Sequence, residues 1–214
     1  MRLFHRNCNS SFFRILSRSL HVPVRPVPRL CGTLVLLLVL APVASCGSSA
    51  LSSHRRADPA PSGFRIASTA FSEGEFIPSR FTCNGEDISP ALRWTAPPNG
   101  TRSFILIVED PDAPGGVWTH WVVYNLPAQA RAMPENVPMQ ETLPTGGLQG
   151  LNSFGHIGYG GPCPPPGNPH HYFFRLYALD TTLSLKAGAS KAEVLGAAKG
   201  HFLGEAQLMG RFKR

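Results

Sequence analysis

Two segments of this sequence gather polar side chains that could bind a small charged ligand. The segment EDPDAPGGVWTHW (residues 109–121) contains two aspartates and His120, and the segment GYGGPCPPPGNPHHY (residues 158–172) contains His170 and His171. In each segment a histidine stands directly before an aromatic residue that opens an apolar run. Rigid loops that bring polar side chains to the ends of strands are typical of small-ligand sites on a sheet scaffold. We therefore expect the two segments to form one site.

The apolar runs beside these segments predict the elements that position them. They are short and rich in β-branched or aromatic residues, which is typical of buried strands. The predicted strands cover residues 104–108 (FILIV), 121–124 (WVVY) and 172–179 (YFFRLYAL). The 21 prolines and 21 glycines of the chain leave little room for helix. The sequence therefore predicts a mainly β fold, a sandwich of sheets with large Pro- and Gly-rich loops.

One short helix is expected near the C-terminus. Ser190 and Glu193 form the pattern of a capping box, residues 192–199 are mostly good helix formers, and Gly200 is suited to end the helix. A last apolar run, residues 206–212, is expected to return to the sheet.

The N-terminal region predicts export. Residues 1–45 contain six arginines and no acidic residue, and their apolar run, residues 30–43, is shorter than the roughly 20 residues of a membrane-spanning helix. The run ends in VASCG (residues 43–47), which resembles a bacterial lipobox, so Cys46 is predicted to carry lipid and to anchor the protein to the cell membrane. Plain secretion or periplasmic release after cleavage, and an uncleaved anchor, are the alternatives. Residues 46–63 read as a flexible tether, and residues 64–214 as one globular domain.

The charge of the chain does not indicate a nucleic-acid partner. The full chain has a formal net charge of +7, which is typical of proteins that bind anionic polymers. Six of the 20 Lys and Arg residues and none of the 13 acidic residues lie in residues 1–45, so the remainder carries only +1.

The cysteines are consistent with an oxidising compartment. Cys8 and Cys31 lie in the leader and Cys46 is the lipidation candidate, which leaves Cys83 and Cys163 as an even pair. We expect a disulfide between them, and two separate buried thiols are the alternative. Neither cysteine has a partner at short spacing, so no metal site is predicted, and no cofactor is expected.

Several ordered motifs of the domain resemble one known family. They are DPDAP, WTHW, GPCPPPGNPHHY, FTCNGEDISPALRW (residues 81–94) and YALD (residues 177–180). Together they resemble the phosphatidylethanolamine-binding protein (PEBP) family, in its bacterial branch of Raf kinase inhibitor-like proteins, over residues 64–212. The resemblance implies a PEBP-like β-sandwich with a small pocket for phosphate, acetate or a phosphoethanolamine head group. The pocket residues that it implies are Asp110, Asp112, Trp118, His120, Gly161, Pro162, His170 and Tyr172. One position departs from the family, because His171 stands where an arginine is usual.

The implied pocket combines carboxylates with an anionic ligand, which requires protons between them. Two unit charges 4 Å apart repel by about 4 kcal/mol at an effective dielectric constant near 20. We therefore expect His120 and His170 to donate to the anion while an aspartate accepts from the far ring nitrogen. The other aspartate would meet an ammonium group, so a zwitterion such as phosphoethanolamine fits both halves. Each aspartate also suits a turn, and a single histidine or Trp118 suits a purely structural role.

Three functions are consistent with the sequence. The first is an exported, lipid-anchored binding protein that holds a small anionic or zwitterionic ligand, or that inhibits a partner such as an exported protease. The second is a metal- or histidine-dependent hydrolase using the same pocket, although the sequence has neither H-E-x-x-H nor G-x-S-x-G. The third is a passive envelope protein. The sequence favours the first, a protein that is not an enzyme.

Overall fold

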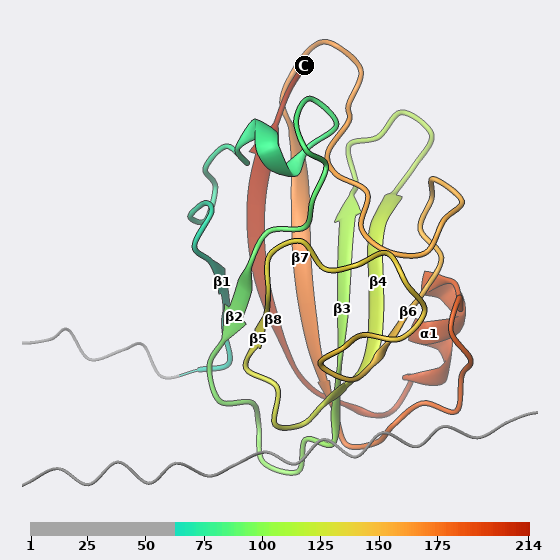
Figure 1. Cartoon of the computed structure of the whole chain (residues 1–214). Coiled ribbons are helices and arrows are strands. Elements are labelled where there is room, and N and C mark those ends of the chain that lie inside the picture. Colours follow the sequence, from blue (N-terminus) through green and yellow to red (C-terminus); the bar gives the residue numbers. More distant parts are fainter. Residues whose placement is uncertain (1–62) are drawn as a thin grey trace, which may run out of the picture. The chain divides into compact units, whose positions relative to one another are not determined.

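The computed structural model describes residues 63–214, which form two antiparallel sheets (Figure 1). The smaller sheet has the strand order β1-β2-β5, with β1 at Ile66–Ser68, β2 at Leu92–Trp94 and β5 at Ala132–Met133. The larger sheet has the order β6-β4-β3-β7-β8, with β3 at Ser103–Asp110, β4 at Trp118–Pro127, β6 at Leu148–Gln149, β7 at His170–Leu179 and β8 at Phe202–Phe212. A 3-10 helix, η1, covers Ser79–Phe81, and the helix α1 covers Lys191–Ala197.

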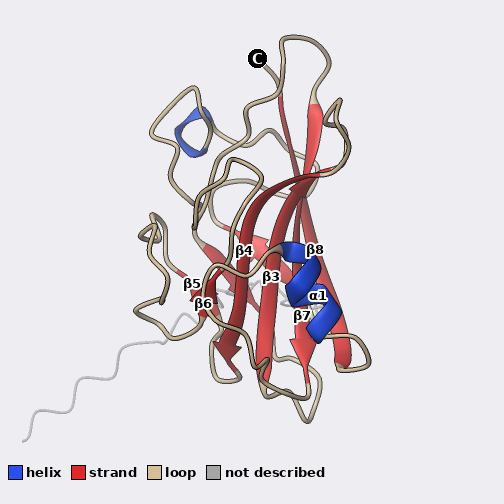
Figure 2. Ribbon diagram, turned by 90° about the vertical axis from the view of Figure 1, so that its right-hand side faces the viewer, coloured by secondary structure: helices blue, strands red, loops and turns tan. Residues whose placement is uncertain are grey.

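The hydrophobic core has two parts, one on each face of the larger sheet. Leu106 and Val108 of β3 belong to the main core between the sheets, whereas Ile105 and Ile107 belong to a second cluster that includes Val194 of α1. Successive side chains of a strand point to opposite faces, so the unbroken apolar run of β3 supplies both clusters. Figure 2 shows α1 and the smaller sheet on opposite sides of the larger one.

The predicted mainly β fold is confirmed, and the predicted strands lie inside β3, β4 and β7. The strands are longer than predicted because backbone pairing continues past the apolar runs. Asp110 of β3 pairs with Trp118 of β4, and His170 of β7 pairs with Phe212 of β8. His120 and His170 consequently lie within strands, which corrects the prediction that they end the preceding loops.

The predicted capping box is present at the start of α1. Ser190 Oγ accepts a hydrogen bond from the backbone N–H of Glu193, and the Glu193 carboxylate accepts one from the N–H of Ser190. The helix ends at Ala197, two residues earlier than predicted, and Gly200 has a φ of 86° just beyond it. The predicted return of residues 206–212 to the sheet is the C-terminal part of β8.

A disulfide joins Cys83 to Cys163, as predicted, with 5.4 Å between the two Cα atoms. It links the segment after η1 to the Pro-rich segment before β7, across 80 residues of sequence. These two segments are thereby fixed beside each other.

The predictions for the N-terminal region fall almost entirely outside the described residues. These are the leader at residues 1–45, the lipidation of Cys46 and the tether at residues 46–63, and the domain boundary at residue 64 stays a prediction with them. Within residues 63–214, no helix is both long enough and apolar enough to cross a membrane.

Candidate functional site

The two polar segments meet at one end of the larger sheet. β3 pairs with β4 on one side and with β7 on the other, so Asp110 at the end of β3 lies between Trp118 and the start of β7. A pocket of about 190 Å³ opens there. Its walls are formed by Asp110, Ala113, Pro114, Trp118, His120, Phe154, Cys163, Pro164, Pro165 and His170.

A buried carboxylate holds one of the two pocket histidines. Asp110 Oδ2 accepts a hydrogen bond from His170 Nδ1 at 2.8 Å, and Asp110 Oδ1 accepts one from the backbone N–H of Asp112 at 2.8 Å. Asp110 is only 3 % exposed. The predicted contact between an aspartate and a ring nitrogen of a pocket histidine is therefore present at His170.

The second pocket histidine is held by the backbone instead. His120 Nδ1 lies 2.6 Å from the carbonyl oxygen of Gly160. A carbonyl can only accept, so Nδ1 carries the proton and Nε2 is the position at which the ring can take up another. This corrects the expectation that an aspartate orients His120. Burial lowers the pKa of His120, although the bond to Gly160 and the charge of Asp110 oppose that shift. Its imidazole is thus neutral at pH 7 when no ligand is bound.

Aromatic side chains form the outer wall of the pocket. Phe154 packs edge to face against both Trp118 and His120, with 5.4 Å between ring centroids in each case. No sequence pattern indicated Phe154, because it lies in a segment without apolar periodicity. Its place is set by Asn152, whose Oδ1 accepts the backbone N–H of Phe154 and whose Nδ2 donates to Gly158 O. An asparagine in a Gly-rich segment is the sequence signal that points to this turn.

Gly161 and Pro162 lie behind the pocket wall and do not line the pocket. The N–H of Gly161 donates to Asp87 Oδ1 at 2.7 Å, and Pro162 O accepts from the N–H of Cys83. A Cβ on Gly161 would lie 2.4 Å from Asp87 Oδ1, so no other residue fits this position without a shift. Asp87, which no local sequence pattern singled out, has a φ of 56°. These contacts hold the segment whose next residues, Cys163 to Pro165, form the wall.

Asp112 and His171 form a separate, exposed pair beside the pocket. Asp112 Oδ2 accepts hydrogen bonds from His171 Nδ1 at 2.7 Å and from the backbone N–H of His171 at 2.8 Å. Desolvation alone would raise the pKa of Asp112, but the hydrogen bonds from His171 outweigh it and lower the pKa below its usual value. Asp112 is therefore already engaged by a histidine, and it is not part of the pocket lining. This corrects the expectation that it is free to meet an ammonium group.

Tyr172 lies under the pocket histidines and not in the lining. Its side chain is fully buried, its ring packs edge to face on His120 at 5.2 Å, and its hydroxyl has no hydrogen-bond partner among the described groups. Burial and the nearby charge of Asp110 raise its pKa, so it stays a neutral phenol. Tyr172 can therefore support His120 by packing.

The pocket is thus suited to binding and proton uptake. It holds one buried carboxylate and two imidazoles whose Nδ1 atoms are both committed, so further protons go to Nε2. Within residues 63–214, no group of three or more His, Cys, Asp or Glu side chains is placed to hold a metal ion.

Known proteins have sequences similar to more than half of this chain. A UPF0098 protein of Methanothermobacter thermautotrophicus is 55 % identical over 145 residues, which cover 68 % of this chain and 95 % of that protein. UPF0098 protein YbcL of Escherichia coli is 44 % identical over 127 residues, which cover 55 % of this chain and 69 % of that protein. Neither name states an activity.

Solved structures agree with these sequence relatives. A PEBP homolog from Chlamydia trachomatis matches with a TM-score of 0.65 and 40 % identity, over 71 % of this chain and 98 % of that chain. YbcL of E. coli, described as a member of the mammalian PEBP family, matches with a TM-score of 0.67 and 36 % identity, over 72 % and 99 %. The family model for "Phosphatidylethanolamine-binding protein" matches residues 67–213. With the pocket formed from the DPDAP, WTHW and HHY motifs, this match shows that the chain belongs to the phosphatidylethanolamine-binding protein family.

Proposed function

We propose that this PEBP-family binding protein is exported and lipid-anchored, and that its pocket binds a small anionic or zwitterionic ligand of the phosphoethanolamine type. The observation that supports the proposal is the hydrogen bonding of the Nδ1 atoms of the two pocket histidines. His120 and His170 line one pocket, and each has its Nδ1 atom committed to an acceptor. Each ring therefore takes up its second proton at Nε2, where the imidazolium becomes a donor to an anion.

Binding of an anion is coupled to proton uptake in this proposal. The unliganded pocket contains the Asp110 charge and a neutral His120, so it repels a bare phosphate. When His120 takes up a proton as the phosphate binds, its imidazolium donates a hydrogen bond to the phosphate. The negative charge of the phosphate in turn stabilises the imidazolium. Affinity is expected to rise as the pH falls, until His120 is protonated without ligand.

The size and the outer wall of the pocket favour a head group over a whole lipid. About 190 Å³ is below the 300–1,000 Å³ of typical pockets for drug-sized ligands. Trp118 is 37 % exposed and Phe154 is 41 % exposed, so aromatic faces stand at the mouth. An ammonium group is stabilised by such faces through cation–π attraction. We therefore assign the ammonium of a zwitterion to this wall in place of Asp112.

The membrane anchor rests on the lipobox-like sequence at Cys46 and on the Cys83–Cys163 disulfide, which suits an oxidising compartment. It is tested separately by membrane fractionation of the Cys46→Ser variant, which we expect to move to the soluble fraction. The inhibitor role and the hydrolase stay predictions from the sequence.

The ligand is tested by calorimetric titration of the full chain with glycerophosphoethanolamine, phosphoethanolamine and inorganic phosphate at pH 6 and pH 8. Glycerophosphoethanolamine is a phosphodiester and lacks the second phosphate ionisation near pH 6, so its pH dependence reports the protein. We expect saturable binding that is tighter at pH 6 and lost in His120→Ala. The matched control is His201→Ala, which removes an exposed histidine paired with Asp180. Absence of binding at millimolar ligand, or equal binding by the two variants, would contradict the proposal.

A further inference from the structure

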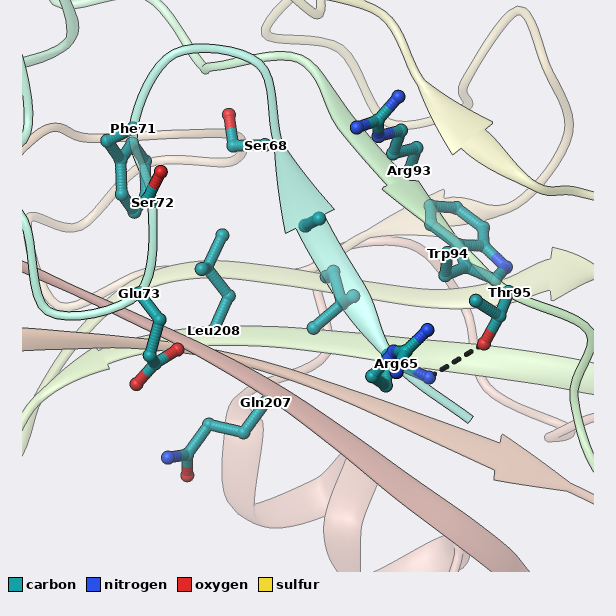
Figure 3. Close-up of a pocket in the computed structure, with 12 residues that line it drawn as sticks. Arg65, Ser68, Phe71, Ser72, Glu73, Arg93, Trp94, Thr95, Gln207 and Leu208 are labelled. Carbon is teal, nitrogen blue, oxygen red and sulfur yellow. Dashed lines mark hydrogen bonds between the residues drawn. The ribbon is translucent and has the colours of Figure 1, made fainter. Parts of the chain in front are cut away.

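A second, larger cavity lies between the open edges of the two sheets (Figure 3). It is a groove of about 690 Å³ and shares no lining residue with the histidine pocket. Its floor is apolar and is formed by Ile66, Phe71, Trp94 and Leu208, which are all buried. β1, β2, β8 and the segment after β1 provide the walls.

One wall is the edge of β1 that pairs with no other strand within residues 63–214. β1 is the outer strand of the smaller sheet, and its neighbour β2 is bonded through Thr95 N–H to Arg65 O. Backbone groups of a strand alternate between its two sides. Arg65 and Ala67 therefore face β2, and the N–H and C=O groups of Ile66 and Ser68 are directed to the free edge.

The opposite wall is the edge of β8, which already accepts one extended segment of this chain. Gly74 N–H donates to Met209 O and Ile77 N–H donates to Arg211 O, so these β8 residues direct their backbone groups away from β7. By the same alternation the backbone groups of Gln207 also face outward. Gln207 lines the groove, which thus begins where the segment Gly74–Ile77 stops.

Some charged side chains of the groove already have a partner within the described residues, and others do not. Glu73 accepts the backbone N–H of Met209 at 2.9 Å, whereas Arg65 and Arg93 form no ion pair within residues 63–214. The indole N–H of Trp94 is buried and has no acceptor among the described groups. Figure 3 shows Arg65, Trp94 and Thr95 at one end of the groove and Glu73 at the other. The donors without partners therefore gather at the arginine end.

We propose that this groove binds an extended acidic segment of a partner protein, added as a strand along the outer edge of β8. The outward backbone groups of β8 provide main-chain hydrogen bonds for an extended peptide, and β1, whose Cα atoms come within 8 Å of those of β8, flanks the same groove. The free guanidinium groups of Arg65 and Arg93 select an acidic side chain at their end of the groove, through charge-assisted hydrogen bonds. The surface is distinct from the phosphoethanolamine-type pocket and does not depend on it.

Selection from random heptapeptides displayed on phage tests the proposal, with the full chain as bait. We expect acidic peptides to be enriched. A synthetic copy of the enriched peptide should bind the Arg65→Glu/Arg93→Glu variant at least tenfold more weakly, and that variant should enrich basic peptides. Lys199→Glu, a charge reversal just after α1, is the matched control and should bind within twofold of the original protein.

Two substitutions of Gln207 distinguish main-chain hydrogen bonding of the peptide from contact with the Gln207 side chain. Gln207→Pro removes the outward N–H without removing a bond to β7 and should weaken peptide binding at least tenfold, whereas Gln207→Ala should leave it within twofold. Hydrogen exchange on the unchanged protein gives an independent measure, because the peptide should slow exchange of the Gln207 amide. No enrichment, enrichment without acidic preference, or no protection of this amide overturns the proposal. A further contradicting result is that the unchanged protein is a dimer, that the Arg65→Glu/Arg93→Glu variant is a monomer, and that no acidic peptide is enriched. That result would assign the groove to a second copy of the chain.

Discussion

Asp110 accepts the Nδ1 proton of His170 at 2.8 Å in a nearly solvent-free position, with side-chain exposures of 4 % and 12 %. The chain holds a second aspartate–histidine pair with the same 2.8 Å separation, Asp180 with His201, but those side chains are 47 % and 45 % exposed. The two pairs share their chemistry and differ in burial. A comparison of the two pairs therefore shows how much burial adds to the stabilisation that such a pair provides.

Asp110→Asn is expected to lower the free energy of unfolding by about 1–3 kcal/mol, because the buried acceptor of His170 Nδ1 and of the Asp112 N–H loses its charge. Asp180→Asn should change it by less than about 0.5 kcal/mol, since water replaces an exposed partner. Urea denaturation of the two variants at pH 7.5 measures both values. Equal losses would show that the buried carboxylate has no special role.

Stability should fall in mildly acidic solution because of His120. Burial lowers its pKa in the folded protein below the usual value of 6.5, so the unfolded chain binds the extra proton first as the pH falls. The contribution is fully present above pH 6.5 and decreases below it, with a slope of up to about 1.4 kcal/mol per pH unit until the folded-state pKa is reached.

Denaturant titrations between pH 8 and pH 5 measure this slope. His120→Asn keeps a donor near Gly160 but cannot be protonated, so its slope should be smaller than that of the original protein. The His201→Ala variant should keep the full slope. A slope that is unchanged in His120→Asn would assign the acid sensitivity to another group.

Gly161→Ala should destabilise the fold and weaken the pocket wall. The added Cβ would lie 2.6 Å from the backbone oxygen of Phe81 as well as close to Asp87, and a backbone atom cannot rotate away. We expect a loss of about 1–3 kcal/mol, as for other overpacked sites. Gly115→Ala is the control, because nothing lies within 4 Å of the Cβ that it would add. Thermal unfolding compares the two, and a loss at Gly115 as large as at Gly161 would rule out the clash as the cause.

The paired change Cys83→Ser/Cys163→Ser should remove up to about 4.5 kcal/mol of stability, the chain-entropy value for a loop of about 80 residues. It should also weaken ligand binding, since Cys163 is part of the pocket wall. Urea denaturation with and without dithiothreitol measures the first effect. The reductant should destabilise the original protein and leave the serine variant unchanged, and the opposite result would refute a stabilising disulfide.

The sequence predicted what depends on local pattern and missed what depends on register. Apolar runs located β3, β4 and β7, and the Ser190–Glu193 spacing located α1. The contact of Asp110 with His170 joins positions 60 residues apart. It arises only when β3 lies between β4 and β7. The family resemblance placed both residues in one pocket and the charge argument paired an aspartate with a histidine, but no sequence pattern specified which pair.

Other parts of the site had no local signal. Phe154 is placed by the turn that Asn152 stabilises, and Asp87 by its bond to Gly161, so neither could be found without the three-dimensional path of the loops. The partner of His171 could not be predicted either, because Asp112 reaches it across the end of the sheet.

The order of the strands along the chain, with β8 after both polar segments, sets the order in which the site can be completed. This strand pairs with β7 over its whole length, from Leu179 opposite Phe202 to His170 opposite Phe212. A polypeptide that emerges from a ribosome or a translocation channel with its N-terminus first has released both polar segments before β8. The pocket strand β7 therefore lacks its outer neighbour until residues 202–212 have appeared, and a chain that lacks them leaves the edge of β7 open to non-native pairing.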